Sequence, residues 1–289
     1  MGISKKQKLK LGLVKLWPLH NKFRVASKLL PMVSKNGETL FTGISFLRDN
    51  HLLHTNTGNY LDYMVFTTGS YEPAIAGLIS SQLNAGSTVM DIGANVGIHT
   101  ITMAKTVGPT GKVYAFEPIG FLRKKIEENL WLNNLHNVHI MPVALSNEAG
   151  SQQIYFDEND SNLGTASLGK KTAHTNLEID IKVGDEVASQ LDMDRLDLIK
   201  IDVEGFELKV LKGMEKTISA LRPRIIFEFD VNYIKRVEED GMDVKQEIFQ
   251  YFDSKGYRLF EIANHGMVHI DSADGFPWSS NVFALPGKK

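Results

Sequence analysis

The sequence predicts an α/β fold in which seven strands form one mostly parallel sheet. From about Tyr71 onward, short apolar stretches repeatedly lead into a glycine-bearing turn and then into a stretch with helical periodicity. This alternation is typical of a parallel sheet whose strands are joined by crossover helices. The composition favours a folded domain, because 43% of the 289 residues are hydrophobic and 23% are charged. These values exclude a disordered chain and a collagen, and the lack of cysteine excludes a disulfide scaffold.

The seven strands and their helices can be placed in chain order. The first strand begins the segment Ser87–Gly97, and the helix after it is expected to end near Thr106, before Gly108. The other strands are expected at 112–117, 138–145, 196–202, 224–229, 257–262 and 281–285. Periodic apolar residues predict further helices at 121–135, at 206–218 and at 244–255. The last two strands have no helical pattern between them, so we expect them to pair antiparallel at one edge of the sheet.

A segment of different character precedes the predicted sheet. Residues 1 to about 35 have a helical pattern, a turn is expected at 35–38, and residues 41–63 suggest short strands. We therefore expect residues 1–70 to form an appendage made of a basic helix and short strands, and residues 71–289 to form the main domain. Residues 150–190 of that domain are expected to be irregular strands and loops.

Basic residues are concentrated at the N-terminus. Nine lysines and arginines precede Glu38, the first acidic residue, so this segment carries a charge of +9. The rest of the chain has 23 basic and 34 acidic residues and carries a charge of -11. An acidic body excludes a nucleic-acid-binding surface spread over the whole protein, so an anionic partner would have to meet the N-terminal segment.

The N-terminal segment is a candidate for peripheral membrane contact. Leu9, Leu13, Leu16 and Trp17 recur at helical spacing beside the lysines, as in helices that lie on an anionic membrane. The apolar stretch 9–19 is too short and too interrupted to span a bilayer or to act as a secretory signal. We therefore expect a cytoplasmic protein, with residues 1–30 either contacting the inner face of the membrane or forming a solvated basic helix.

Three acidic residues stand at the ends of predicted strands: Asp91, Glu117 and Asp202. In an open parallel sheet, ligands bind at the carboxyl ends of the strands, where the strand order reverses. Gly93 and Gly97 follow Asp91 and would let the backbone approach a ligand closely. Glu117 comes 26 residues after Asp91, close to the spacing of a nucleoside-binding unit, and its carboxylate can accept hydrogen bonds from both hydroxyls of a ribose.

The turn after the first strand distinguishes between nucleoside cofactors. Dinucleotide-binding enzymes use the pattern G-x-G-x-x-G to hold a pyrophosphate at the N-terminus of a helix. Here the turn reads Asp91-Ile-Gly-Ala-Asn-Val-Gly97, and a carboxylate at the strand end would repel a pyrophosphate but suits an ammonium or sulfonium group. The turn favours S-adenosylmethionine over NAD, and an NAD-dependent oxidoreductase is the weaker alternative.

Five stretches between residues 71 and 230 carry motifs in a fixed order. They are Tyr71–Pro73, Val89–Gly97, Tyr114–Pro118, Val143–Ser146 and Ile199–Glu207. Together they resemble the FkbM-type methyltransferases, a family of the class I S-adenosylmethionine-dependent superfamily. The resemblance implies a Rossmann-like seven-strand sheet with an antiparallel last strand, S-adenosyl-L-methionine as the cofactor, and methyl transfer, usually to a hydroxyl oxygen.

The resemblance also implies which residues contact the cofactor. Glu117, with Pro118 beside it, would hold the ribose hydroxyls, and Ala144 would lie near the adenine. Asp202 would lie near the sulfonium and the amino group, whereas Asp91 would mainly order the turn. The other implied contacts are Glu72, which would cap the pocket, and the turn residues around the methionine part, Gly93, Ala94, Asn95 and Gly97.

Asp202 and Glu204 are the candidate catalytic residues. Both follow the fourth strand, where one of them would accept the proton of the acceptor hydroxyl or orient that hydroxyl. Two alternatives stay open: Glu204 and Gly205 could only begin the next helix, and Asp202 could help to hold a divalent ion. Of the nine histidines only His265 and His269 have the H-x-x-x-H spacing, and they fall in a segment expected to be a loop rather than a helix, so no dedicated metal site is expected. His99 is expected to be a packing or surface residue.

We expect the methyl acceptor to be a small molecule or a glycan rather than a nucleic acid. Base-methylating enzymes carry an Asp/Asn-Pro-Pro-Tyr/Phe element after the fourth strand, but here that place reads Asp202-Val-Glu-Gly205. The resemblance implies hydroxyl groups of glycans, glycolipids or other small natural products as acceptors. A non-catalytic cofactor-binding or scaffold protein with the same fold is the other alternative.

Overall fold

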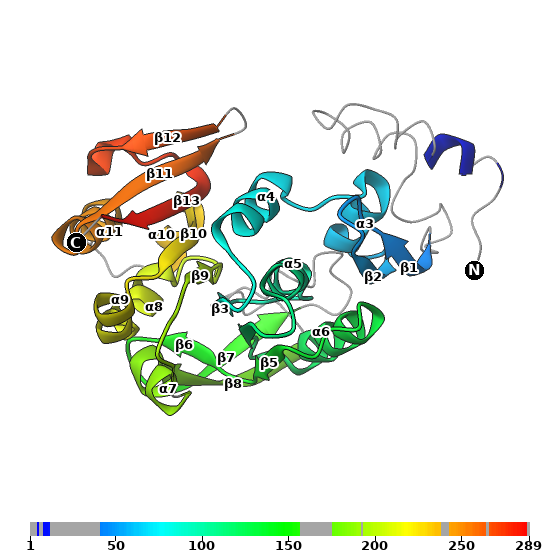
Figure 1. Cartoon of the computed structure of the whole chain (residues 1–289), viewed down its shortest axis with the longest axis horizontal. Helices are drawn as coiled ribbons and strands as arrows, with labels where there is room; N and C mark the ends of the chain where they lie inside the picture. Colours follow the sequence, from blue (N-terminus) through cyan, green and yellow to red (C-terminus); the bar gives the residue numbers. More distant parts are fainter. Residues whose placement is uncertain are drawn as a thin grey trace.

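Among the described residues, eight strands form the central sheet of the protein (Figure 1). The computed structural model describes residues 5, 8–11, 41–156, 175–191, 193–237, 243–263 and 266–287. From one edge of the sheet to the other, the strands are β12 (Gly266–Ile270), β11 (Tyr257–Ala263), β13 (Ser279–Pro286), β10 (Arg224–Asp230), β9 (Leu198–Ile201), β3 (Thr88–Ile92), β4 (Lys112–Phe116) and β5 (Val138–Met141).

The sheet is mostly parallel, as the sequence predicts. Strands β10, β9, β3, β4 and β5 pair in parallel, whereas β13 is antiparallel to both of its neighbours, β10 and β11. The predicted α/β, Rossmann-like class and its antiparallel last strand are therefore confirmed. The eighth strand, β12, lies where the sequence suggested a loop, because four of its five residues are exposed and leave no alternating apolar pattern.

The predicted third strand is divided between two sheets. The central sheet takes β5, and the chain then leaves it at Pro142, which has no N–H group to donate to a neighbouring strand. The following strand, β6 (Ala144–Ser146), pairs instead in a second sheet of order β6-β8-β7. That sheet contains β7 (Gly150–Phe156) and β8 (Thr175–Val183), so much of the region expected to be irregular is regular structure.

Three predicted helices are confirmed, and a fourth is divided. Helices α5 (Ile98–Val107), α6 (Gly120–Leu132) and α11 (Val244–Ser254) match the expected ranges. The helix expected at 206–218 is two helices, α8 (Glu207–Gly213) and α9 (Glu215–Leu221). Gly213 passes so close to β6 that a Cβ atom there would collide with the carbonyl oxygen of Ser146, and the chain bends at Met214. The other helices of the main domain are α4 (Pro73–Gln82), α7 (Gly184–Gln190) and α10 (Val231–Val237).

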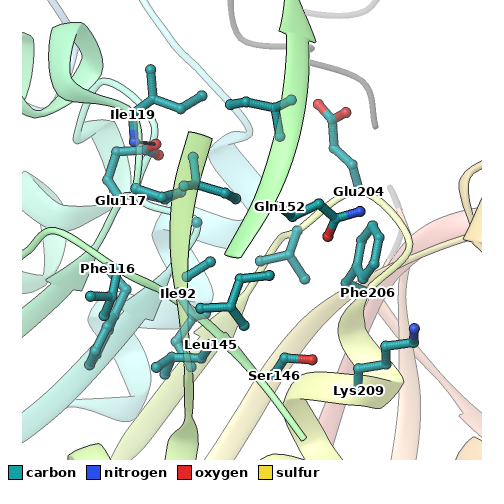
Figure 2. Close-up of a pocket in the computed structure, with 18 of the residues that line it drawn as sticks. Ile92, Phe116, Glu117, Ile119, Leu145, Ser146, Gln152, Glu204, Phe206 and Lys209 are labelled. Atoms are coloured by element: carbon teal, nitrogen blue, oxygen red, sulfur yellow. Dashed lines mark hydrogen bonds between the residues drawn. The ribbon is translucent and has the colours of Figure 1, made fainter. Parts of the chain in front are cut away.

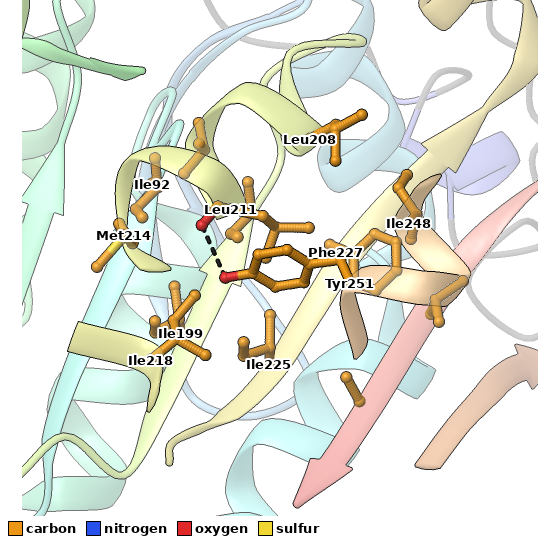
Figure 3. Close-up of a cluster of buried hydrophobic side chains, with 14 of the residues drawn as sticks. Ile92, Ile199, Leu208, Leu211, Met214, Ile218, Ile225, Phe227, Ile248 and Tyr251 are labelled. Carbon is orange, nitrogen blue, oxygen red and sulfur yellow. Dashed lines mark hydrogen bonds between the residues drawn. The ribbon is translucent and has the colours of Figure 1, made fainter. Parts of the chain in front are cut away.

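Helices cover the parallel strands on both faces. On one face, the apolar side chains of β9 and β10 pack against α8, α9 and α11. Figure 3 shows the ring of Tyr251 inserted into this cluster, where its hydroxyl donates a hydrogen bond to the carbonyl oxygen of Leu211 at 2.8 Å. On the other face, Val89, Val113 and Ile226 pack against α4 and α5. The strands are therefore buried on both sides, as expected for a parallel sheet.

A β-hairpin and a short helix dock on the outer side of α6. The hairpin consists of β1 (Thr42–Phe46) and β2 (Leu52–Asn56), and it leads into α3 (Tyr60–Thr68). The prediction of strands up to residue 63 is wrong for its last residues, because the Asn59 side chain accepts hydrogen bonds from the N–H groups of Leu61 and Asp62 and begins a helix. The division of the chain at residue 70 stays a prediction.

Most of the basic N-terminal segment lies outside the described residues. Residues 5 and 8–11 are helical, but the membrane contact expected through Leu13, Leu16 and Trp17 falls on residues that the structure does not describe. In the part of the chain that is described, no helix has both the length and the apolar composition needed to cross a bilayer.

The side chain of Asn129 is expected to hold the hairpin on α6. It is buried, its Oδ1 accepts a hydrogen bond from the His54 N–H at 2.8 Å, and its Nδ2 donates to the Val96 carbonyl oxygen at 2.9 Å. Replacing Asn129 by alanine leaves both backbone groups without these partners, so we expect the free energy of unfolding to fall by about 2 kcal/mol. Urea denaturation measures this change. A control, Glu128→Ala on the exposed face of the same helix, is expected to have little effect; equal losses in both variants would contradict this role.

Candidate active site

A cavity of about 380 Å³ lies at the carboxyl ends of β3, β4 and β9 (Figure 2). Strand β3 has β4 on one side and β9 on the other, so the cavity lies where the strand order reverses, which is the ligand-binding position of open α/β sheets. Strands β7 and β8 of the second sheet form its opposite wall through Gln152, Ile154, Ile179 and Ile181.

The glycine turn after β3 forms one side of the cavity. Gly93 has a φ of 82° and lies so close to the end of β9 that a Cβ atom would collide with the carbonyl oxygen of Asp202. A residue with a side chain cannot take this place without moving the strand end. Asn95 also has a positive φ, 54°, and its N–H group points to the carboxylate of Glu117 at 2.9 Å.

Glu117 forms the side of the cavity at the end of β4. Its side chain is buried, with Oε2 accepting the hydrogen bond from Asn95 and Oε1 accepting one from the N–H group of Ile119 at 2.9 Å. Burial raises the pKa of Glu117 to about 7, although the two backbone hydrogen bonds oppose the rise. Each carboxylate oxygen can accept a second hydrogen bond, so Glu117 can hold two hydroxyl groups of a ligand.

A buried lysine connects two of the predicted acidic residues. Lys200 of β9 is 3% exposed, and its Nζ lies 2.9 Å from Asp202 Oδ2 and 3.9 Å from Asp91 Oδ1. Burial disfavours its charge, but the carboxylates of Asp202 and Asp91 outweigh this effect and raise the pKa of Lys200. Burial likewise opposes ionisation of Asp202, but the Lys200 ammonium outweighs it and lowers the pKa of Asp202. The site therefore holds an ionised aspartate beneath the cavity.

Lys200 is a residue of the site that is not among the predicted ones. Its signal was a lysine between Ile199 and Ile201 in an otherwise apolar strand, since a lysine is almost never buried without an ionic partner. The strand register places an ionic partner beside Lys200, because Asp91 of β3 is paired with Lys200 of β9.

A second, smaller cavity of about 30 Å³ lies behind the glycine turn and is lined by Tyr71, Asp91, Lys200 and Asp202 among others. His99 also lines it and is 5% exposed, so it is a buried residue. The Nε2 atom of His99 lies 2.8 Å from Glu72 Oε2. Glu72 precedes α4 with a left-handed φ of 38°, so this bond ties the segment before α4 to α5.

The loop after β9 carries Glu204 into the large cavity. Figure 2 shows its side chain at the end of the cavity that also contains Gln152 and Phe206. Glu204 does not begin the helix directly, because α8 starts at Glu207. The carboxylate of Glu207 accepts hydrogen bonds from the N–H groups of Val203 and Gly205 at 3.1 and 3.2 Å and so fixes this loop.

The predicted site residues divide between the two cavities. Those that line the large cavity are Gly93, Asn95, Glu117, Pro118, Ala144, Asp202 and Glu204. Asp91 and Ala94 line the small cavity instead. Gly97 caps α5 beside Ile126, and Glu72 reaches the site through His99. Within the described residues, no group of three or more His, Asp or Glu side chains is placed to hold a metal ion.

Three residues at the far end of the large cavity are also not among the predicted site residues. These are Gln152 from β7, Phe206 from the loop after β9 and Lys209 from α8. The Lys209 Nζ lies 5.5 Å from the centre of the Phe206 ring. Phe206 lies in the Ile199–Glu207 motif, but no local motif marks Gln152 or Lys209, because the three residues meet only where the second sheet comes close to α8.

The known proteins that the chain is similar to include several methyltransferases. Residues 91–259, more than half of the chain, match the model of the methyltransferase FkbM domain. The chain is 29% identical over 193 residues to methyltransferase sdnD of Sordaria araneosa, covering 57% of this chain and 71% of that protein. It is 25% identical over 150 residues to the hexuronic acid methyltransferase AglP of Haloferax volcanii, covering 52% and 59%.

Solved structures with some likeness include other methyltransferases. A methyltransferase FkbM from Methylobacillus flagellatus KT has a TM-score of 0.45 and 15% identity, and the alignment covers 70% of this chain but only 44% of that one. A methyltransferase described as putative, from Streptococcus mutans in complex with SAH, has a TM-score of 0.42 and 13% identity, covering 74% and 97%. Because the match to the domain model covers more than half of the chain, the chain belongs to the FkbM methyltransferase family, whose cofactor is S-adenosylmethionine.

Proposed function

We propose that the protein transfers a methyl group to a hydroxyl oxygen of a glycan, a glycolipid or another small natural product. The observation that carries this proposal is the composition of the far end of the cavity, where Gln152, Glu204 and Phe206 come together. An amide and a carboxylate can bind hydroxyl groups, and an aromatic ring offers an apolar face to a sugar or a ring system. The hexuronic acid specificity in the name of AglP supports a sugar acceptor.

The residues at the strand ends fit the cofactor. A cavity of about 380 Å³ is in the size range of small-molecule and cofactor sites. Glu117 can accept hydrogen bonds from two ribose hydroxyls, and Gly93 of the turn lines the same cavity. Asp202, held ionised by Lys200, supplies the negative charge that a sulfonium and an amino group require.

The protein's part in the reaction is alignment and proton acceptance. Bound S-adenosylmethionine supplies an electrophilic methyl group on a sulfonium. By fixing both reactants in the cavity, the protein can contribute on the order of 7–11 kcal/mol through proximity. Of the two candidate catalytic residues, Asp202 is a poor base because Lys200 lowers its pKa. Glu204 is the better candidate to take the proton from the acceptor hydroxyl, while Asp202 orients the methyl donor, S-adenosylmethionine.

Replacing Glu117 by glutamine is expected to weaken S-adenosylmethionine binding about tenfold or more, because two charge-assisted hydrogen bonds to the ribose are lost. Ionised Glu117 binds the hydroxyls better, and its pKa is raised to about 7. Wild-type affinity should therefore rise as the pH rises through 7, and Glu117→Gln should lack this rise. Isothermal titration calorimetry measures both effects, with Glu128→Gln as the matched surface control. An unchanged dissociation constant in Glu117→Gln would exclude the ribose assignment.

Glu204→Gln tests the proton acceptor. Turnover is expected to fall by about 10²- to 10⁴-fold, the usual contribution of a positioned base, while the dissociation constant for S-adenosylmethionine stays unchanged. Asp202→Asn should instead weaken cofactor binding. Rates are measured from the S-adenosylhomocysteine released with a saturating acceptor. Full turnover by Glu204→Gln would show that another group, or water, takes the proton.

The acceptor class is tested by product analysis. The enzyme is incubated with S-adenosylmethionine and a panel of methyl glycosides, uronic acid glycosides, glycolipids and hydroxylated natural products. Mass spectrometry is expected to find the mass gain of one methyl group on an oxygen of a sugar or a related hydroxyl compound. Glu117→Gln serves as the control that binds the cofactor poorly. Methylation of DNA, RNA or a protein, with none on the hydroxyl panel, would contradict the proposal.

A further inference from the structure

Glu228 lies beside Asp202 at the carboxyl end of the neighbouring strand. Phe227 of β10 is paired with Ile201 of β9, so the next residue of each strand, Glu228 and Asp202, comes level with the other. Neighbouring strands are about 4.8 Å apart. Because side chains alternate along a strand, both residues point to the face that also carries Lys200. Their carboxyl groups are close enough for each to affect the pKa of the other.

The charges around this pair do not balance if every carboxyl is ionised. Lys200 is the cation of the cluster, and Asp91 and Asp202 already face it at 3.9 and 2.9 Å. Glu228 would add a further negative charge next to Asp202, and two adjacent carboxylates in a buried site cannot both ionise readily. A hydrogen bond between two carboxyls also requires a proton on one of them. Since Lys200 holds Asp202 ionised, the proton belongs on Glu228.

The other groups around Glu228 also favour its neutral form. Glu207 from α8 and Glu72 from the segment before α4 are acidic, and Tyr71 beside Glu72 is neutral. Tyr233 of α10 belongs to the same surroundings. Burial is the largest cause, and Asp202 and Glu207 add to it, so that the pKa of Glu228 is raised to about 9, with Lys200 opposing the rise.

We propose that Glu228 is a positioning residue, a neutral carboxyl that donates a hydrogen bond to Asp202 and holds its carboxylate toward the cofactor. Lys200 then donates to Asp202 from its own strand, and Glu228 donates from the next one. With both donors in place, the Asp202 side chain has one orientation at the point where it lines both cavities. The inference rests on the proposed role of Asp202 toward the cofactor, which Asp202→Asn tests separately.

Two substitutions of Glu228 distinguish hydrogen bonding from charge. Glu228→Gln keeps a neutral donor, so its affinity for S-adenosylmethionine at pH 7.5, below the wild-type Glu228 pKa of about 9, should stay close to wild type. Glu228→Ala loses the donor and should bind about tenfold more weakly, as expected for a lost hydrogen bond to a charged group. Above about pH 9 the wild type should lose affinity relative to Glu228→Gln. The amino group of the cofactor titrates equally with every variant, so the ratio between variants isolates Glu228.

The dissociation constants are measured by isothermal titration calorimetry, with Glu128→Gln as the surface control. If Glu228→Gln binds as weakly as Glu228→Ala, Glu228 acts as a carboxylate and the inference is overturned. If both Glu228 variants bind like the wild type while Asp202→Asn binds weakly, Asp202 keeps its role but needs no positioning by Glu228. If Asp202→Asn itself binds like the wild type, the role of Asp202 toward the cofactor is what fails.

A second measurement needs neither cofactor nor acceptor. A carboxyl whose pKa is raised in the folded state, here from 4.5 to about 9, stays protonated while the unfolded chain ionises. Its contribution to stability is fully present below pH 4.5 and is lost as the pH rises to about 9. The free energy of unfolding of the wild type should therefore fall over this range more than that of Glu228→Gln. Parallel curves for the two proteins would show that Glu228 is ionised in the fold.

Discussion

The buried ammonium of Lys200 forms the ion pairs that hold the site together. A charge removed from water is costly unless ionic partners surround it, and here Asp202 and Asp91 provide them from β9 and from the neighbouring β3. The ion pairs lie directly under the glycine turn, where Gly93 touches the carbonyl oxygen of Asp202 so closely that no side chain fits. The turn and the carboxylates of two strand ends therefore form one unit, and a change in one of them moves the others.

The carboxyl groups of the site have different tasks because their surroundings differ. Asp202 is kept ionised by an adjacent cation, whereas burial raises the pKa values of Glu117 and Glu207 to about 7. Both of these glutamates accept hydrogen bonds from backbone N–H groups and thereby fix a loop that borders the cavity. Carboxyl groups thus supply a fixed charge, a proposed ligand-binding group and a structural tie, according to their partners.

The two ends of the cavity come from different parts of the fold. The parallel sheet builds the end with Glu117 and the glycine turn, and helices pack on both faces of that sheet. The other end is formed where the second sheet and the start of α8 meet, with Gln152 and Phe206 facing each other. The proposed cofactor end therefore belongs to the buried sheet and the proposed acceptor end to loops and short strands, which accept change at less cost.

The sequence is enough to predict the parallel sheet, the antiparallel last strand, the glycine turn and the acids at the strand ends, because each depends on a local pattern or on residues close in the chain. It missed β12, the passage of the chain from β5 to β6 and the bend at Met214, where exposure or a close approach to another strand decides the structure. Which side chains share a proton or an ion pair depends on contacts that form only in the folded protein. Strand register places Lys200 beside Asp91, and Glu228 level with Asp202, from segments far apart in the chain, and burial there changes their ionisation.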